Sequence, residues 1–196
     1  MPISAKDVQK LRMLTGAPMM DAKKALEETS GDFEKAKDVL RKKGQAKAAK
    51  KAERETREGI IGSYIHGDKI GVLIEVNSET DFVARNDNFK DFVHNVAMHI
   101  AAACPTYLVR EDVPKDVLDK EKEIFTEQLK DQNKPAEILE KIINGKIEKF
   151  YLENVLMDQL YVRDDSKTIN DLTTEVIAKL GENVQIRRFT RYQIGD

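Results

Sequence analysis

At residues 60–76 the chain reads IIGSYIHGDKIGVLIEV, and this pattern sets the architecture of its larger part. Two runs rich in Ile and Val, residues 60–65 and 70–76, flank the tetrapeptide at 66–69. The flanking runs are typical of strands, and the glycine and aspartate between them are typical of a tight turn. The sequence therefore predicts a β-hairpin here.

Helices and one more strand follow the hairpin. Residues 86–104 place apolar side chains at the spacing of one broad helical face, and Pro105 ends that pattern. A helix is predicted for residues 168–180, stopped by Gly181, and a strand for residues 184–194. Because strands bracket the helices, we expect an α+β fold in which helices cover one face of a small antiparallel sheet.

A charged segment at about residues 113–154 interrupts this domain. Pro114 begins a pattern with a narrow apolar stripe, and a predicted turn at Asn133-Lys134-Pro135 separates it from a second such pattern. Two helices of this kind, joined by a short turn, pack against each other along their stripes. We therefore expect a helical hairpin, or coiled arm, that projects from the domain.

The first part of the chain predicts three short helices separated by glycines. Ser4 with Asp7 resembles a capping box at the first helix, Asp32 caps the third, and Gly44 is expected to close it. So few large apolar residues make a marginal module, which is better suited to docking than to catalysis.

Positive charge is concentrated before the sheet. Up to Glu58 the chain has 15 basic and 10 acidic residues, whereas the whole chain has 33 and 35. We divide it into a three-helix domain at 1–45, a basic helical linker at 46–58 and a core domain at 59–196. The basic residues from Arg41 to Arg57 could meet a phosphate backbone, but no aromatic residue interleaves them for base stacking, which favours a solvated linker.

The composition limits the class of protein. The chain has 196 residues, 40% of them hydrophobic, which is enough for a core without disulfide or metal support. Its longest apolar run, Ile100 to Cys104, is far shorter than a membrane span, and Met1 to Asp7 has no signal-peptide pattern. The single cysteine, Cys104, cannot form an internal disulfide, and we expect it to pack as a small apolar side chain. A cytoplasmic protein is predicted.

No group of residues predicts catalysis. His94 and His99 lie five positions apart, about 140° around a helix, so they do not share a ligand face and we interpret both as structural. An enzyme site could be assembled from Asp81, Arg85 and a histidine, but nothing in the sequence places them together. We therefore expect no catalytic residue, no metal site and no cofactor.

The segment Thr80-Asp81-Phe82-Val83-Ala84-Arg85-Asn86 allows two interpretations. In a structural one, Thr80 or Asp81 caps a helix and Phe82 packs as a hydrophobic staple. In a functional one, Phe82 projects beside a carboxylate as an apolar wedge that opens a site on another protein.

Met19 and Met20 are also ambiguous. They follow Thr15-Gly16-Ala17-Pro18 in what the sequence predicts to be a loop between two helices. Methionine fills irregular cores, and it also forms adaptable apolar surfaces for partner helices. The sequence leaves both roles open.

Several separated segments match one protein family in the right order. They are Leu11-Arg12, Thr15-Gly16-Ala17, Met19-Met20-Asp21, Lys23-Lys24-Ala25-Leu26, Lys47 to Ala52, Tyr64 to Leu73, Thr80 to Ala84, Ala97-Met98-His99-Ile100-Ala101 and Lys134-Pro135. Over nearly its whole length the chain resembles the bacterial elongation factors Ts, the nucleotide exchange factors for the GTPase elongation factor Tu.

The resemblance implies a fold and a mode of action. It implies a three-helix domain like the ubiquitin-associated domain, a linker and an α+β core, with no catalytic side chains. In this family an Asp-Phe pair, here Asp81 and Phe82, enters the GTPase near its magnesium site. The pair disturbs the coordination of the magnesium ion and lets the phosphate loop of the GTPase rearrange, so that GDP leaves and GTP enters. Thr80 and the residues from Val83 to Asn86 flank that pair in the same loop.

The resemblance also implies partners. Arg12, Met19 and Met20 match positions that dock on a helix of the GTPase domain, and the core rests on another domain of elongation factor Tu. Binding to the GDP-bound and nucleotide-free forms is implied, with no required nucleic acid. The chain lacks the duplicated core of longer members, and shorter members pair two subunits. We therefore expect a noncovalent homodimer that binds two GTPases.

Overall fold

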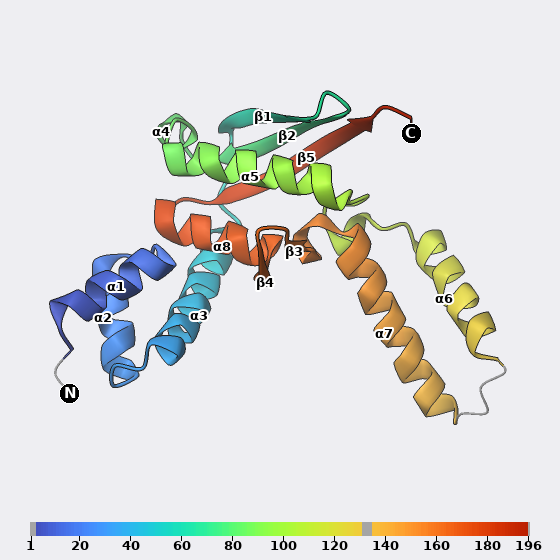
Figure 1. Cartoon of the computed structure of the whole chain (residues 1–196), viewed down its shortest axis with the longest axis horizontal. Coiled ribbons are helices and arrows are strands. Elements are labelled where there is room, and N and C mark those ends of the chain that lie inside the picture. The colour runs from blue at the N-terminus through green and yellow to red at the C-terminus, as the bar shows by residue number, and fades with distance from the viewer. Residues whose placement is uncertain (1–2, 131–134, 196) are drawn as a thin grey trace.

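The computed structural model describes residues 3–130 and 135–195, which form the predicted α+β architecture. Three antiparallel strands make the main sheet in the order β1 (Glu58–His66), β2 (Ile70–Ser78) and β5 (Val184–Gln193). Helices α5 (Asp87–Ala103) and α8 (Ile169–Leu180) lie on one side of this sheet (Figure 1). Within residues 3–130 and 135–195, no helix is both long and apolar enough to span a bilayer.

The predicted hairpin is confirmed. Strands β1 and β2 pair from Glu58 opposite Ser78 to His66 opposite Ile70. Gly67 and Asp68 both have positive φ angles, 52° and 57°, which is the conformation of the tight turns that match the twist of two strands. The turn residues therefore set the register, and with it the choice of side chains that face α5.

Helix α5 and the sheet enclose the main core. The helix buries Phe89, Phe92, Val93, Val96, Ala97, His99, Ile100 and Ala101. Val72, Ile74 and Val76 of β2 face them and are almost fully buried. Because each large apolar side chain contributes about 1.5–3 kcal/mol when buried, this layer is the largest source of stability in the domain.

The opposite face of the sheet is open. Ile61, Ile65, Leu73 and Tyr192 are 71%, 62%, 50% and 72% exposed, and the strand register places them on the side away from α5. We call these four residues the outer sheet face. Among residues 3–130 and 135–195, helices thus cover one face of the sheet and not the other, as predicted.

The first three helices have a core of their own. They are α1 (Ala5–Thr15), α2 (Met19–Glu28) and α3 (Phe33–Lys51). Their buried residues are Val8, Leu11, Ala22, Ala25, Leu26 and Ala36. Ser4 and Asp32 cap α1 and α3 as predicted, and Gly16 ends α1 with a φ of 67°.

The prediction that Gly44 closes the third helix is wrong. Helix α3 continues through Gly44 to Lys51, so the first six residues of the predicted linker at 46–58 are the last part of this helix. A Cβ at position 44 would lie 3.6 Å from Thr174 Cγ2 and 3.8 Å from Ala178 Cβ of α8. Packing against α8 therefore offsets the cost of a glycine inside a helix, about 1 kcal/mol.

The predicted arm is a pair of helices, α6 (Lys115–Leu129) and α7 (Ala136–Asn154), which extend away from the sheet in Figure 1. Asn133 and Lys134 of the predicted turn lie outside the described residues. Arg110 lies at the base of the arm, where its guanidinium bonds to Glu148 of α7 at 2.9 Å and to Asp158 at 2.8 Å. These carboxylates raise the pKa of Arg110 further above its ordinary value.

Two short strands complete the core domain. Strand β3 (Leu160–Tyr161) pairs with β4 (Asp164–Thr168) directly before α8. The sequence pattern did not predict a strand here. Thr168 ends β4 and caps α8, where its side chain and that of Asp171 form a capping box.

Candidate partner-binding site

The segment at residues 80–86 folds as a short helix, α4 (Asp81–Ala84), between β2 and α5. Thr80 is its N-cap, and Thr80 Oγ1 accepts a hydrogen bond from Val83 N at 3.4 Å. Asn86 caps α5 in turn, because its Oδ1 accepts a hydrogen bond from Asn88 N at 2.9 Å. The predicted capping by Thr80 is confirmed.

Two residues of this turn anchor it in the core. Val83 and Ala84 are each only 5% exposed and belong to the main hydrophobic cluster. Backbone bonds close the turn, from Arg85 N to Asp81 O at 3.1 Å and from Asn86 N to Val83 O at 2.9 Å. The backbone that carries position 82 is therefore held by buried contacts on its C-terminal side.

Phe82 does not share that burial. Its side chain is 78% exposed, so the interpretation of Phe82 as a packed hydrophobic staple is wrong. Asp81 and Arg85 form an ion pair of 2.9 Å whose side chains are 59% and 81% exposed, and such a pair contributes little to stability. The turn thus presents a ring and a carboxylate to solvent without a structural need. Together they offer an apolar ring and anionic oxygen atoms to a binding partner.

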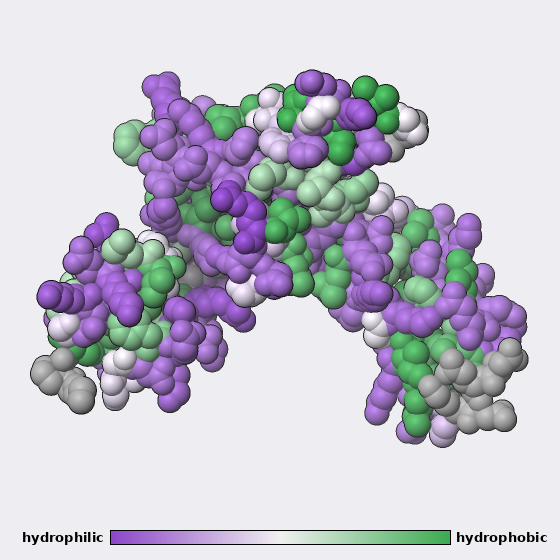
Figure 2. Space-filling view, viewed as in Figure 1, coloured by the Kyte–Doolittle hydropathy of each residue, from purple (hydrophilic) through white to green (hydrophobic). Residues whose placement is uncertain are grey.

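The N-terminal region presents a second exposed surface. Met19 and Met20 begin α2 and do not lie in a loop, and they are 45% and 60% exposed, so their interpretation as core filler is wrong. Arg12, the third predicted site residue of this region, is exposed as well. Figure 2 shows hydrophobic residues among hydrophilic ones on the surface of this three-helix region.

Two further apolar residues of α1 are exposed, and the sequence did not predict them as binding residues. Met13 and Leu14 are 80% and 59% exposed. Leu14 lies three positions after Leu11, a spacing that puts two residues on the same side of a helix, although Leu11 is buried and Leu14 is exposed. We call Met13, Leu14, Met19 and Met20 the N-terminal apolar surface. Spacing alone could not have found it, because the pattern indicated the core.

The basic stretch from Arg41 to Arg57 is largely engaged within the protein. Five of its cations bond to other residues: Lys43 to Glu28, Lys47 to Asp21, Lys51 to the carbonyl of Gly181, Arg54 to Glu79 and Arg57 to Glu55. These contacts argue against phosphate binding, and they tie the stretch to the rest of the protein more closely than the predicted solvated linker implied.

The histidines have structural surroundings. His99 is fully buried, its Nε2 lies 2.9 Å from Gln159 Oε1, and its Nδ1 accepts a hydrogen bond from Val162 N at 3.3 Å. Burial lowers the pKa of His99, which keeps the ring neutral. His94 packs edge-on against the ring of Tyr64. Within the described residues, no group of three or more His, Cys, Asp or Glu could hold a metal ion.

Cys104 differs from its prediction. It forms the left-handed C-cap of α5, with a φ of 49°, and it is exposed. The predicted packing as a small apolar side chain is therefore wrong. A cap position lies beyond the buried face of its helix, and the apolar run from Ile100 gave no sign of that change.

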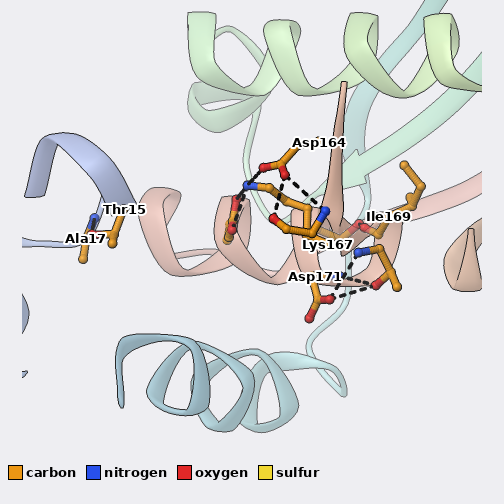
Figure 3. Close-up of polar contacts among 10 residues, drawn as sticks. Thr15, Ala17, Asp164, Lys167, Ile169 and Asp171 are labelled. Atoms are coloured by element: carbon orange, nitrogen blue, oxygen red, sulfur yellow. Dashed lines mark hydrogen bonds and ion pairs between the residues drawn. The ribbon is translucent and has the colours of Figure 1, made fainter. Parts of the chain in front are cut away.

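A cleft of about 440 Å³ separates the three-helix region from β4 and α8. Figure 3 shows Thr15 and Ala17 on one side of it and Asp164, Lys167 and Asp171 on the other. Lys167 pairs with Asp164 at 3.3 Å and with Glu175 at 3.0 Å, so its charge is balanced inside the protein. None of the predicted site residues lines this cleft.

The chain matches one protein family over almost its whole length. The sequence model of the family described as Elongation factor TS matches residues 4–196. The chain is 59% identical over 197 residues to Elongation factor Ts of Fervidobacterium nodosum, with 100% of both chains covered. It is 55% identical over 195 residues to Elongation factor Ts of Thermodesulfovibrio yellowstonii, covering 100% of this chain and 98% of that protein. The Elongation factor Ts of Geobacter sulfurreducens is 56% identical over 197 residues, covering 100% and 91%.

Proposed function

Because this chain belongs to the elongation factor Ts family, we propose that it is a guanine nucleotide exchange factor for the translation GTPase elongation factor Tu. The observation that carries the proposal is the α4 turn. Phe82 is exposed beside Asp81, while Val83 and Ala84 hold the same turn in the core. A rigid turn with an exposed ring and carboxylate is suited to entering a partner's site.

The proposed mechanism follows from this arrangement. The factor binds the GDP-bound form, and Asp81 and Phe82 enter near its magnesium and phosphate site. Asp81 gives up only an exposed ion pair with Arg85, which costs little. Disturbed metal coordination weakens the hold on GDP, and the factor remains on the nucleotide-free GTPase until GTP enters.

The free energy needed to accelerate GDP release requires more than one contact with the GTPase. A thousandfold faster release needs about 4 kcal/mol of preferential stabilisation. Burying Phe82 supplies about 1.5–3 kcal/mol before ordering costs. We therefore propose that Arg12, Met19 and Met20 grip a helix of the GTPase domain while the core rests on another domain. Helix α4 and helices α1 and α2 lie on the same side of the view in Figure 1, as a grip on one partner requires.

The proposed activity needs no chemistry from this chain. Exchange makes and breaks no covalent bond, so we propose a protein that is not an enzyme, uses no cofactor and requires no nucleic acid. Elongation factor Tu works in translation, and we accordingly place this protein in the cytoplasm.

The proposed homodimer has a candidate interface. The outer sheet face, Ile61, Ile65, Leu73 and Tyr192, presents four exposed apolar side chains on three adjacent strands. Exposed apolar surface of this kind marks association sites. A second copy presents the same face, and a twofold axis brings two such faces together. We propose that this face pairs the two subunits.

Release of a fluorescent GDP from the elongation factor Tu of the same organism tests the function. We expect the wild-type protein to accelerate release and Phe82→Ala to lose most of the acceleration. Leu160→Ala is the matched control, because it removes an apolar side chain that is 52% exposed and lies in β3. This control should behave as the wild type.

The outcomes separate function from mechanism. No acceleration by the wild-type protein would contradict the exchange function. Acceleration that Phe82→Ala retains in full would keep the function and contradict the role of Phe82.

A further inference from the structure

The loop between α8 and β5 contacts the α4 turn, although the contacting residues are 102 positions apart in the sequence. Glu182 in this loop accepts two hydrogen bonds from Thr80, from the backbone N to Oε2 at 3.0 Å and from Oγ1 to Oε1 at 2.8 Å. A second carboxylate bonds in the opposite direction, because Glu79 Oε1 accepts a hydrogen bond from Asn183 N at 2.6 Å. Two adjacent residues before α4, Glu79 and Thr80, are therefore hydrogen-bonded to two adjacent residues of the loop, Asn183 and Glu182 respectively.

These bonds fix the residue directly before Asp81 and Phe82. The N–H and hydroxyl of Thr80 donate to Glu182, and its carbonyl accepts hydrogen bonds from Ser78 Oγ at 2.9 Å and from Ala84 N at 3.3 Å. With its hydroxyl hydrogen committed to Glu182, Thr80 Oγ1 offers a lone pair to Val83 N. Glu182 thus sets the orientation of the cap that begins α4.

The same loop is itself held in place. Asn183 is 2% exposed and donates from Nδ2 to the carbonyl of Arg54 at 2.9 Å. Lys51 donates to the carbonyl of Gly181, and the guanidinium of Arg54 pairs with Glu79. The end of α3 and the residues that follow it therefore brace the loop, and Arg54 balances the charge of Glu79.

We infer that Glu182 is a positioning residue for nucleotide exchange, acting through Thr80 to hold Asp81 and Phe82 in the orientation that enters the partner. This inference rests on the proposed exchange function. Glu182 does not need to touch the partner. Its two bonds remove freedom from the turn before binding, and a preorganised wedge loses less entropy when it inserts.

The first measurement is made on the free protein. Hydrogen exchange of the Thr80 and Val83 amides should be faster in Glu182→Ala, while the amides of α5 keep their protection. Glu175→Gln is the matched control, since it removes a carboxylate of α8 that pairs with Lys167 and not with Thr80. Unchanged exchange at Thr80 in Glu182→Ala would overturn the inference.

The second measurement is GDP release from elongation factor Tu as a function of factor concentration. We expect Glu182→Ala to lower the maximal rate about tenfold, which corresponds to about 1.4 kcal/mol. The concentration for half-maximal effect should stay within about twofold, because the N-terminal apolar surface is unchanged. Glu182→Gln, which keeps one acceptor oxygen, should recover part of the rate.

A merely structural role predicts a different result. It would lower the melting temperature and weaken binding, and it would leave the maximal rate of the folded protein unchanged. A maximal rate in Glu182→Ala equal to that of the wild type overturns the positioning inference alone. A wild-type protein that does not accelerate release overturns the exchange function itself.

A double variant tests the route through Thr80. Thr80→Val removes the hydroxyl that bonds to Glu182 Oε1. If Glu182 acts through Thr80, adding Glu182→Ala to Thr80→Val should reduce the maximal rate less than Glu182→Ala does in the wild-type chain. Full additivity of the two losses would contradict the route.

Discussion

Val93 of α5 lies directly against Gly62 of β1, where a Cβ at position 62 would be 2.4 Å from Val93 Cγ1. A side chain at position 62 fits only if the Val93 side chain or the helix shifts. Glycine at position 62 is therefore what lets α5 pack closely on the hairpin, and this packing supports the strand that leads into the α4 turn.

Substitution of Gly62 by alanine should lower the free energy of unfolding by about 1–3 kcal/mol, because overpacking displaces α5. Combination with Val93→Ala should cost less than the sum of the two single changes. Urea denaturation measures both. Gly145→Ala is the control, because apart from the adjacent residues and the backbone of its own helix no described atom lies within 4 Å of a Cβ there, and alanine favours α7. A Gly62→Ala protein as stable as the wild type would contradict the close contact.

Loss of the Phe82 ring should leave stability unchanged. Because Phe82 is 78% exposed, we expect Phe82→Ala to alter the free energy of unfolding by less than about 0.5 kcal/mol. Phe89→Ala, at a fully buried position of α5, should cost about 3–5 kcal/mol in the same denaturation experiment. A cost for Phe82→Ala near that of Phe89→Ala would show that the ring packs, and its proposed role would fail.

Stability should fall as pH drops below about 6.5, in part because of His99. Burial lowers its folded pKa below the ordinary value of 6.5, so the unfolded chain binds a proton more readily in the window between the two values. The contribution of neutral His99 to the free energy of unfolding is fully present above that window and is lost as the pH falls through it. A proton on Nδ1 would also face the N–H of Val162, which donates to that atom.

His99→Gln isolates this effect from the carboxylates. The variant should be less stable than the wild type at about pH 7.5, and the difference should shrink at about pH 5.5. A difference for His99→Gln that does not depend on pH would contradict the prediction.

The proposed dimer should depend on the outer sheet face. Leu73→Lys places a charge in the middle of that face, opposite Ser63 and Thr190 in the register, and should convert a dimer into a folded monomer. Analytical ultracentrifugation at micromolar concentration measures the mass. Leu160→Lys, at a similarly exposed apolar position in β3, should remain dimeric. A wild-type protein that sediments as a monomer would refute the dimer.

Local sequence patterns predicted the secondary structure correctly where packing against distant segments did not oppose them. Ser4, Asp32 and Thr80 cap helices as their side chains favour, and Gly67 with Asp68 forms the expected turn. The same rules failed where contacts between distant segments were stronger. Gly44 does not end α3, because α8 packs against it. Strand β4 was not predicted, because its polar residues lack the alternation typical of a half-buried strand.

The sequence by itself determined the α+β class, the hairpin, the arm and the segment that carries Asp81 and Phe82, since each depends on the periodicity and turn chemistry of neighbouring residues. Only the tertiary structure decided which of those residues face solvent. Phe82 and Val83 are adjacent apolar residues, yet one is exposed and the other buried, because the core lies on one side of the turn. Glu182 meets Thr80 across 102 positions, and no local pattern encodes a contact that the packing of β5 beside β2 creates.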